Sequence, residues 1–281
     1  MSEPGGREDW VRRMRQWGVR PSRSKGQNFL LDDEVVSGIA EAARAGDGVP
    51  LLEIGPGLGI LTEELLARGA DVTAIELDDT LASRLRDHFG DHPRFRLIDG
   101  DATVVDPTEL FARDKPYRIV ANLPYSVATV IIRHFLESGH PPEELVVMVQ
   151  REVAERMTAS AGDLSLLALA ILLYTVPGYL FTVPKEAFHP VPKVTSAVVR
   201  LRVRAEQLLT ARERDRLFEL ATVAFQQKRK TLSNSLAPEV GMDKPDFVKR
   251  LAAIGIDASL RPQALAFEDW LRLARLEVAE A

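Results

Sequence analysis

The 281-residue chain contains no cysteine, so disulfide bonds and thiolate metal sites are excluded, and we expect an intracellular, cytoplasmic protein. Long hydrophobic runs are missing too. The longest apolar stretch, residues 164–174, is far shorter than the roughly 20 residues that a membrane span needs, so it is interpreted as a buried helix or strand. The N-terminus has no apolar run behind a basic start, which argues against a secretory signal. We expect no membrane role.

Histidine is scarce, and its spacing does not match that of metal ligands, so we predict no metal site. The five histidines are His88, His92, His134, His140 and His189. The chain is 46% hydrophobic and 27% charged, which is ordinary for a globular protein. Its length suits one large domain with a smaller companion. A monomer is the expectation.

An excess of positive charge is also absent. The chain has 36 Lys and Arg against 41 Asp and Glu, a net charge of -5, which argues against coating nucleic acid by bulk charge. Two basic clusters nevertheless stand out. One is the N-terminal arm, residues 1–28, with Arg23 and Lys25, and the other is Lys228, Arg229 and Lys230. Both can meet phosphate, although solvated helix faces are the commoner explanation of such runs.

Short apolar runs alternate with helical patterns from residue 49 onward. Strands are predicted at 50–54, 72–75, 95–98, 118–121, 145–149, 179–183 and 197–203. Helices are predicted at 60–68, 80–89, 127–136 and from residue 152. This alternation predicts an α/β fold, a Rossmann-like doubly wound sheet that is mostly parallel.

After residue 204 only helical periodicity remains. Apolar faces recur at 212–227, 245–254 and 267–276, which predicts a small all-helical domain. We therefore expect a catalytic domain at 29–205 and a helical domain at 206–281 that binds RNA or the ribosome, with the boundary near 205–210.

A glycine-rich loop joins the first predicted strand to the first predicted helix. Gly55, Gly57 and Gly59 let the backbone turn tightly and approach a ligand closely. Their G-x-G-x-G spacing differs from the G-x-G-x-x-G of pyrophosphate binders. The loop alone indicates a nucleotide-type site or an ordinary turn.

Two acidic residues follow the next two strands. Glu76 ends the second strand about 20 residues beyond the loop, where a carboxylate can accept hydrogen bonds from both ribose hydroxyls. Asp101 follows the third strand, where it can accept a hydrogen bond from an adenine amine. Each alone also suits a helix cap or a turn. At successive strand ends they favour a nucleoside.

The residues Asn122-Leu123-Pro124-Tyr125 lie just beyond the fourth strand, at the edge where open α/β sheets bind ligands. An exocyclic nucleobase amine is a poor nucleophile, so acceptors must hold its hydrogens. The Asn122 side-chain oxygen and the Leu123 carbonyl suit that task, Pro124 fixes the turn, and Tyr125 can stack on the base. A plain Asn-Pro turn is the alternative.

These residues resemble the motifs of the ribosomal RNA adenine dimethyltransferases, and in particular those of the small-subunit enzymes. The resemblance spans nearly the whole chain. It rests on five ordered segments, at residues 25–30 (KGQNFL), 53–59, 75–78 (IELD), 122–125 (NLPY) and 187–194 (AFHPVPKV), with 228–232 (KRKTL) following.

The resemblance implies S-adenosylmethionine as methyl donor and two adjacent adenosines near the 3′ end of small-subunit ribosomal RNA as acceptors. It assigns the cofactor to Asn28, Leu30, Gly55, Gly57, Glu76, Asp101 and Asn122. It places the target adenine between Tyr125 and Phe188. RNA contacts are expected from Arg23, Lys25, Lys193, Lys228, Arg229 and Lys230. Without the resemblance, residues 27–28 suggest a helix N-cap and Phe188 a hydrophobic staple.

Departures from the family pattern include Ser126, Ala128 and Val130 after the fourth-strand motif, and His189. None removes a proposed contact. Three other functions stay open: a methyltransferase of large-subunit ribosomal RNA, a ribosome-assembly factor whose catalysis is secondary, and an NAD-dependent oxidoreductase. The last is disfavoured because the glycine spacing is wrong for it.

Overall fold

The computed structural model describes residues 6–21, 27–124 and 127–276. It divides into two compact units. The first contains residues up to Ala154 together with Pro177–Val203, and the second contains Glu155–Val176 together with the residues from Arg204 onward. Among the described residues, no helix is both long and apolar enough to cross a membrane.

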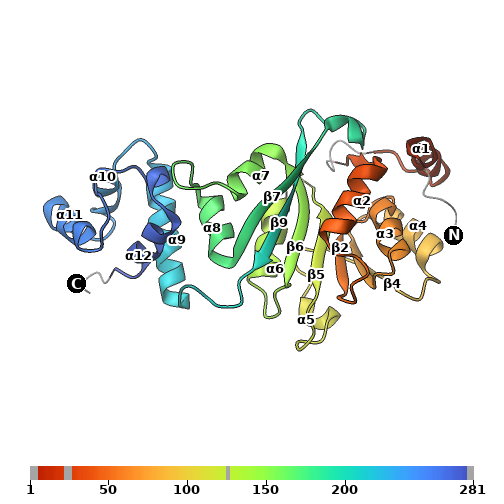
Figure 1. Ribbon diagram of the computed structural model, residues 1–281, viewed down its shortest axis with the longest axis horizontal. Coiled ribbons are helices and arrows are strands. Elements are labelled where there is room, and N and C mark those ends of the chain that lie inside the picture. Colours follow the sequence, from red (N-terminus) through yellow and green to blue (C-terminus); the bar gives the residue numbers. More distant parts are fainter. Residues whose placement is uncertain (1–5, 22–26, 125–126, 277–281) are drawn as a thin grey trace. The chain divides into compact units, whose positions relative to one another are not determined.

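The first unit is built around a sheet whose strands run in the order β4-β3-β2-β5-β6-β9-β7 (Figure 1). In chain order these strands are β2 (Leu51–Ile54), β3 (Val72–Glu76), β4 (Phe95–Asp99), β5 (Arg118–Asn122), β6 (Glu144–Gln150), β7 (Thr175–Val183) and β9 (Ser196–Val203). Neighbours from β4 to β6 pair in parallel, and β9 is antiparallel to β6. The predicted fold, a doubly wound and mostly parallel sheet, is confirmed.

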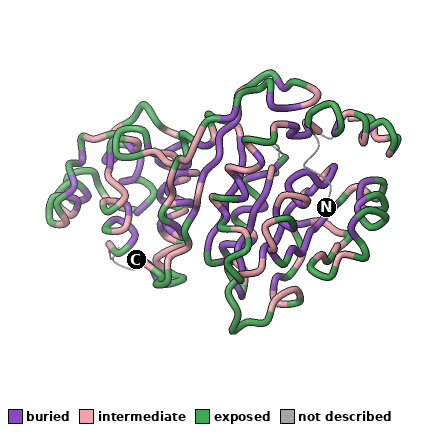
Figure 2. Tube along the Cα trace, turned by 45° about the vertical axis from the view of Figure 1, so that its right-hand side comes forward, coloured by how far each residue is buried: buried purple, intermediate pink, exposed green. Residues whose placement is uncertain are grey.

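The inner strands of the sheet are buried along most of their length, and buried segments are drawn in purple in Figure 2. All residues of β2 and β3 are buried, and so are all but the last residue of β5 and β6. This is why these segments appear as continuous apolar runs in the sequence, since helices cover both faces of a parallel sheet. The edge strand β4 contains no buried residue.

Three helices of this region begin at an aspartate that caps the first turn. The helices of the region are α1 (Arg7–Gln16), α2 (Asp33–Ala42), α3 (Ile60–Ala67), α4 (Asp79–Phe89), α5 (Pro107–Leu110), α6 (Ala128–Leu136) and α7 (Arg151–Met157). Asp32 caps α2 by accepting a hydrogen bond from the Val35 backbone at 3.0 Å. The N-cap of α2 therefore lies five residues after Gln27, and the N-cap suggested for residues 27–28 is wrong.

A second, two-stranded sheet lies outside the main one. It pairs β1 (Phe29–Leu30) with β8 (Phe188–His189) in antiparallel fashion, and β8 follows the short helix η1 (Lys185–Ala187). Sequence periodicity predicted neither strand, because two residues are too few to show alternation. This β1–β8 ribbon joins two segments that are about 160 residues apart in the chain.

The second unit is helical. It contains α8 (Leu166–Tyr174), α9 (Ala211–Gln226), α10 (Leu232–Leu236), α11 (Lys244–Ala253), the short helix η2 (Pro262–Ala264) and α12 (Phe267–Ala274). Leu169 and Leu173 of α8 belong to the same hydrophobic cluster as Leu217 and Leu220 of α9. Residues 155–176 consequently group with this unit, which differs from the predicted extent of the catalytic domain, 29–205.

The predicted N-terminal arm, residues 1–28, is not a separate element in its described part. Helix α1 buries Trp10 and Met14 in the core of the first unit, together with residues of α2 and α3. The spacing of these two side chains, four residues apart, places them on one face of the helix. The arginines between them hide this apolar face in the sequence.

Trp270 gives a test of the second unit's core. Its side chain is 0% exposed and stacks on Phe225 with ring centroids 5.4 Å apart. We expect Trp270→Ala to reduce the free energy of unfolding of this unit by about 3–5 kcal/mol, because a large cavity replaces the indole. Calorimetric melting measures the change, with the exposed Val248→Ala on α11 as control. A melting profile equal to that of the control would contradict this account.

Candidate functional site

The polar residues of interest gather where the strand order reverses. From β2 the chain proceeds to β3 and β4 on one side, and it then returns to β5 on the other side of β2. Loops that leave β2 and β5 diverge at this point, which opens a crevice at the carboxyl ends of the strands. The glycine loop follows β2, while Asn122 is the last residue of β5, and Leu123 and Pro124 come directly after it.

The three glycines of the loop adopt the left-handed backbone conformation, with φ of 68° at Gly55, 60° at Gly57 and 78° at Gly59. Space is limited as well. A Cβ on Gly57 would lie 3.2 Å from the ring of Phe29, and one on Gly59 would lie 2.5 Å from that of Phe89. The backbone conformation therefore favours glycine at all three positions, and close packing adds to this at Gly57 and Gly59. Gly59 is also the N-cap residue of α3.

Glu76, the last residue of β3, anchors the loop. Its Oε2 accepts a hydrogen bond from the Gly57 backbone N–H at 3.1 Å, and its Oε1 accepts one from the Asp78 backbone N–H at 2.9 Å. The side chain is buried, with the residue only 7% exposed. Burial raises the pKa of this carboxyl above its usual value, although the two backbone donors act in the opposite direction.

Glu53 is a second buried carboxyl at the site, and the sequence analysis did not single it out. It accepts a hydrogen bond from the Thr62 hydroxyl at 2.6 Å. Burial raises the pKa of Glu53 to about 8, and the nearby Glu76 contributes in the same direction. Its position at the end of a buried strand, two residues before the first glycine, was a signal that could have identified it.

The Asp78 carboxylate both caps a helix and binds the side chain of Gln27. Its Oδ1 accepts hydrogen bonds from the backbone N–H groups of Thr80 and Leu81, which caps helix α4. Its Oδ2 accepts one from the Gln27 side-chain amide at 3.4 Å. The segment that carries Asn28 is thereby tied to the loop after β3.

The β1–β8 ribbon brings further residues to the site. Leu30 is paired with Phe188, and the Leu31 backbone N–H donates to the Ala187 carbonyl at 2.8 Å. Asn28, Phe29 and Leu30 form part of the cavity wall. The side chain of Phe188, in contrast, is in the hydrophobic core and is 1% exposed.

The segment after β5 is held by its backbone. The Leu123 N–H donates to the Met148 carbonyl at 3.2 Å, which continues the pairing of β5 with β6. The Pro124 carbonyl accepts hydrogen bonds from Val127 and Ala128, both at 3.1 Å, and helix α6 starts there. These bonds fix the direction in which Asn122 leaves the sheet.

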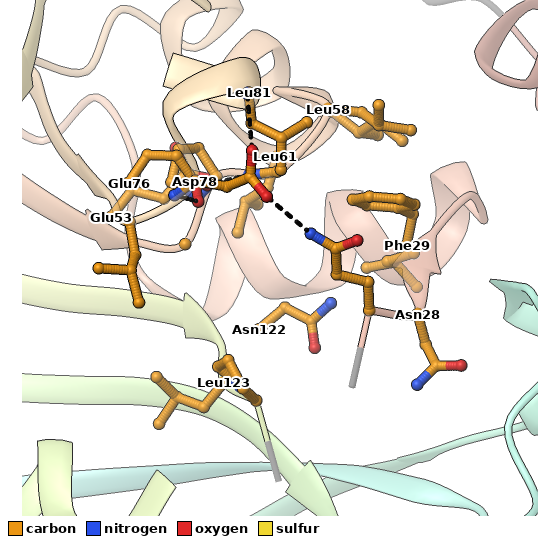
Figure 3. A pocket seen from close by; sticks show the side chains of 18 of the residues that line it. Asn28, Phe29, Glu53, Leu58, Leu61, Glu76, Asp78, Leu81, Asn122 and Leu123 are labelled. Atoms are coloured by element: carbon orange, nitrogen blue, oxygen red, sulfur yellow. Dashed lines mark hydrogen bonds between the residues drawn. The ribbon is translucent and has the colours of Figure 1, made fainter. Parts of the chain in front are cut away.

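These groups enclose one cavity of about 390 Å³, a size that suits a small-molecule ligand. Figure 3 shows Glu76 and Asp78 on one side of it and Asn28 and Asn122 on the other. The lining includes the predicted site residues Asn28, Leu30, Gly55, Gly57, Glu76, Asn122, Leu123 and Pro124. Apolar side chains complete it, among them Phe29, Leu58, Leu61 and Leu81.

Among the described residues, two that were predicted to contact the cofactor or the target adenine, Asp101 and Phe188, do not line this cavity. Asp101 accepts hydrogen bonds from the backbone N–H and the hydroxyl of Thr103, both at 2.8 Å, and these bonds lower the pKa of its carboxyl. Phe188 is buried, as described above. Tyr125 and the basic residues Arg23 and Lys25 lie outside the described residues.

The remaining predicted RNA contacts lie on the surface. Lys193 is exposed in the loop between β8 and β9, in the first unit. Lys228, Arg229 and Lys230 are exposed just beyond the end of α9, in the second unit. Within the described ranges, no group of three or more His, Asp or Glu side chains is arranged to hold a metal ion.

Two curated relatives are similar to this chain over most of its length. The small-subunit ribosomal RNA methyltransferase A of Dehalococcoides mccartyi is 40% identical over 260 residues, covering 92% of this chain and 89% of the relative. The corresponding protein of Moorella thermoacetica is 39% identical over 272 residues, covering 93% and 94%.

Two solved structures share the fold. The 23S ribosomal RNA methyltransferase ErmE has a TM-score of 0.71 at 30% identity, covering 88% of this chain and 98% of that one. A dimethyladenosine transferase from Plasmodium falciparum has a TM-score of 0.72 at 25% identity, covering 86% and 94%. The family model described as ribosomal RNA adenine dimethylase matches residues 20–276. This protein therefore belongs to the ribosomal RNA adenine dimethylase family.

Proposed function

We propose that this enzyme transfers methyl groups from S-adenosylmethionine to the N6 amines of two adjacent adenosines near the 3′ end of small-subunit ribosomal RNA, during ribosome assembly. One observation carries the proposal: a single cavity joins the glycine loop and Glu76 to Asn122, Leu123 and Pro124. The names of the curated relatives at 40% and 39% identity support the small-subunit substrate.

The cavity suits the methyl donor. The Glu76 carboxylate accepts backbone hydrogen bonds from Gly57 and Asp78, and a carboxylate has about four lone-pair sites, which leaves acceptor capacity for a ribose hydroxyl. The glycine loop permits close approach of the backbone, while Asn28 and Leu30 come from the ribbon on another side. When bound, S-adenosylmethionine supplies an electrophilic methyl group on a sulfonium centre.

Asn122, at the end of β5, and Leu123, directly after it, would hold the acceptor amine. The Asn122 side-chain oxygen and the Leu123 carbonyl accept its two hydrogens, which directs the nitrogen lone pair toward the methyl group. Holding the amine in this orientation lowers the entropic part of the barrier to methyl transfer. After the transfer the nitrogen is cationic and loses a proton easily, so the proposal assigns no general base.

The adenine itself must leave its stack to reach Asn122, and stacking on Tyr125 would offset part of that cost. The proposed partner on the other face, Phe188, is 1% exposed. Stacking on Phe188 therefore requires its side chain to leave the core when RNA binds. The exposed Lys193 and the exposed cluster of Lys228, Arg229 and Lys230 are the proposed phosphate contacts.

A second candidate is methylation of large-subunit ribosomal RNA. It is favoured by one observation, the 30% identity with the 23S ribosomal RNA methyltransferase ErmE over 88% of the chain. The identity with the small-subunit enzymes is higher, and the match covers a similar share of this chain. We therefore place the small-subunit substrate first.

An assay with labelled methyl groups separates these candidates. Unmethylated small subunits, large-subunit RNA and naked DNA are offered to the purified protein in parallel. We expect label only in the small subunits, as dimethyladenosine at two neighbouring positions. Transfer to large-subunit RNA alone would overturn the substrate assignment. Binding to small subunits without any transfer would favour an assembly factor.

Asn122 is the residue whose loss should affect chemistry most. We expect Asn122→Ala to reduce methyl transfer by at least about 100-fold, since an acceptor that aligns the amine is removed. Cofactor affinity, measured by calorimetry, should stay measurable. Asn234→Ala, at an exposed position of α10 in the second unit, is the matched control. Full activity in Asn122→Ala would refute the proposed role.

Glu76 predicts a pH dependence of cofactor binding. Because the pKa of Glu76 is raised, the carboxylate protonates as the pH falls, at a pH above the usual glutamate value of about 4.3. Protonation removes acceptor capacity, so affinity should weaken on acidification. Glu76→Gln should bind about 10- to 100-fold more weakly at neutral pH, as expected for lost hydrogen bonds to a charged group.

The measurement is calorimetry with S-adenosylmethionine at a series of pH values, from about pH 8 down toward the usual glutamate pKa of about 4.3. Glu76→Gln should lack the acid-side loss of affinity that the unsubstituted protein shows. Equal pH profiles for the two proteins would assign the effect to another group, such as Glu53.

A further inference from the structure

Helix α1 lies outside the part of the chain that matches the family model, which begins at residue 20. It is nevertheless firmly packed. Trp10 is 3% exposed and Met14 is 6% exposed, and both are in the core cluster of the first unit. Burying two large side chains on one face stabilises a helix of ten residues that would be marginal by itself in water.

Polar contacts fix the orientation of this helix. The Trp10 indole N–H donates to Asp33 Oδ1 of α2 at 3.3 Å. The Arg13 guanidinium lies 4.3 Å from the centre of the Trp10 ring and forms an ion pair with Glu63 of α3 at 2.8 Å. Helix α1 is therefore attached both to α2 and to α3, the helix that follows the glycine loop.

From this anchored helix, Arg7 reaches the β8 segment. Its Nη1 donates to the Glu186 carbonyl at 2.6 Å, and its Nη2 donates to the Phe188 carbonyl at 2.9 Å. A guanidinium can satisfy two carbonyls at once because its donors form a rigid, planar fork. Arg7 thus bridges the residues immediately before and within β8.

Phe188 connects the Arg7 bridge to the wall of the cavity. It pairs with Leu30 across the β1–β8 ribbon, and Leu30 and its neighbours Asn28 and Phe29 form one wall of the cavity. Phe29 also packs against the backbone at Gly57. A displacement of β8 would consequently move the wall that faces Glu76 and Asn122.

The ribbon needs such support from outside. Each of its strands has only two residues, and an isolated two-stranded pair is at best marginally stable in water. Its described hydrogen bonds to the rest of the protein include the bridge from Arg7.

We propose that Arg7 is a positioning residue for methyl transfer: by clamping β8 from helix α1, it fixes the β1–β8 ribbon and with it the Asn28–Leu30 wall of the cavity. The proposal rests on the proposed function, since the rate that it affects is that of methyl transfer. It adds a role for the N-terminal helix that does not depend on contact with RNA.

The test compares Arg7→Ala with Arg12→Ala. Arg12 is on the same helix, and the ion pair given for it is with the exposed Asp9, at 3.0 Å. Both variants remove one positive charge from α1, so any effect of charge on RNA binding appears in both. Effects of the clamp appear only in Arg7→Ala. Arg7→Lys, which keeps the charge but not the fork, should fall in between.

Three quantities are measured in the full-length protein: hydrogen exchange of the backbone amides at residues 29–31 and 187–189, affinity for S-adenosylmethionine, and kcat and KM with unmethylated small subunits. For Arg7→Ala we expect faster exchange in both segments, weaker cofactor binding, and kcat lowered roughly 10-fold, within the ~100-fold that a 1 Å misplacement can cost. The melting temperature should stay close to that of Arg12→Ala.

The proposal is overturned if Arg7→Ala and Arg12→Ala agree in exchange, cofactor affinity and kcat, or if both raise only the KM for RNA. Should Arg7→Ala unfold the first unit, Arg7→Lys and Arg7→Gln decide by the same measurements, because both keep a hydrogen-bond donor. If the unsubstituted protein transfers no methyl group to small subunits, the proposed function fails, whereas exchange and cofactor affinity still decide the role of Arg7.

Discussion

The hydrogen bond from the Gly57 backbone to the Glu76 carboxylate joins the ends of β2 and β3, and the geometry of the cavity depends on it. It holds an acidic group in a buried place while leaving lone pairs for a ligand. The same carboxylate also accepts the Asp78 backbone N–H, and Asp78 in turn caps α4 and holds Gln27. The buried Glu76 side chain thus connects the glycine loop to Asp78, and through Asp78 to helix α4 and to Gln27, which precedes the β1–β8 ribbon.

The main sheet could be predicted because its inner strands are buried on both faces and so appear as uninterrupted apolar runs. The segments missed were those whose structure depends on distant partners. The β1 strand exists only through its pairing with β8, and α1 is stable because Trp10 and Met14 meet a core that the local sequence does not reveal. The grouping of α8 with the helical unit has the same origin.

The residues that line the cavity could be predicted where their place at a strand end brings them there. The glycine loop follows β2, Glu76 ends the neighbouring β3 and Asn122 ends β5, and all of them line one cavity. Asp101 follows the edge strand β4, and its carboxylate is engaged by Thr103 instead. Glu53 was overlooked although its place in a buried strand, two residues before Gly55, is unusual for a carboxyl, and the structure shows its partner, Thr62.

The division of the chain also has a consequence for how it can be cut. The backbone leaves the first unit after Ala154, returns at Pro177, and leaves again after Val203. The helical unit is thus an internal insertion combined with a C-terminal segment. No single cleavage separates the two units, and a chain ending at Val203 would keep α8 without the α9 surface that covers its leucines. Such a fragment would expose the apolar surface of α8 to solvent, and it would associate with itself or with other chains.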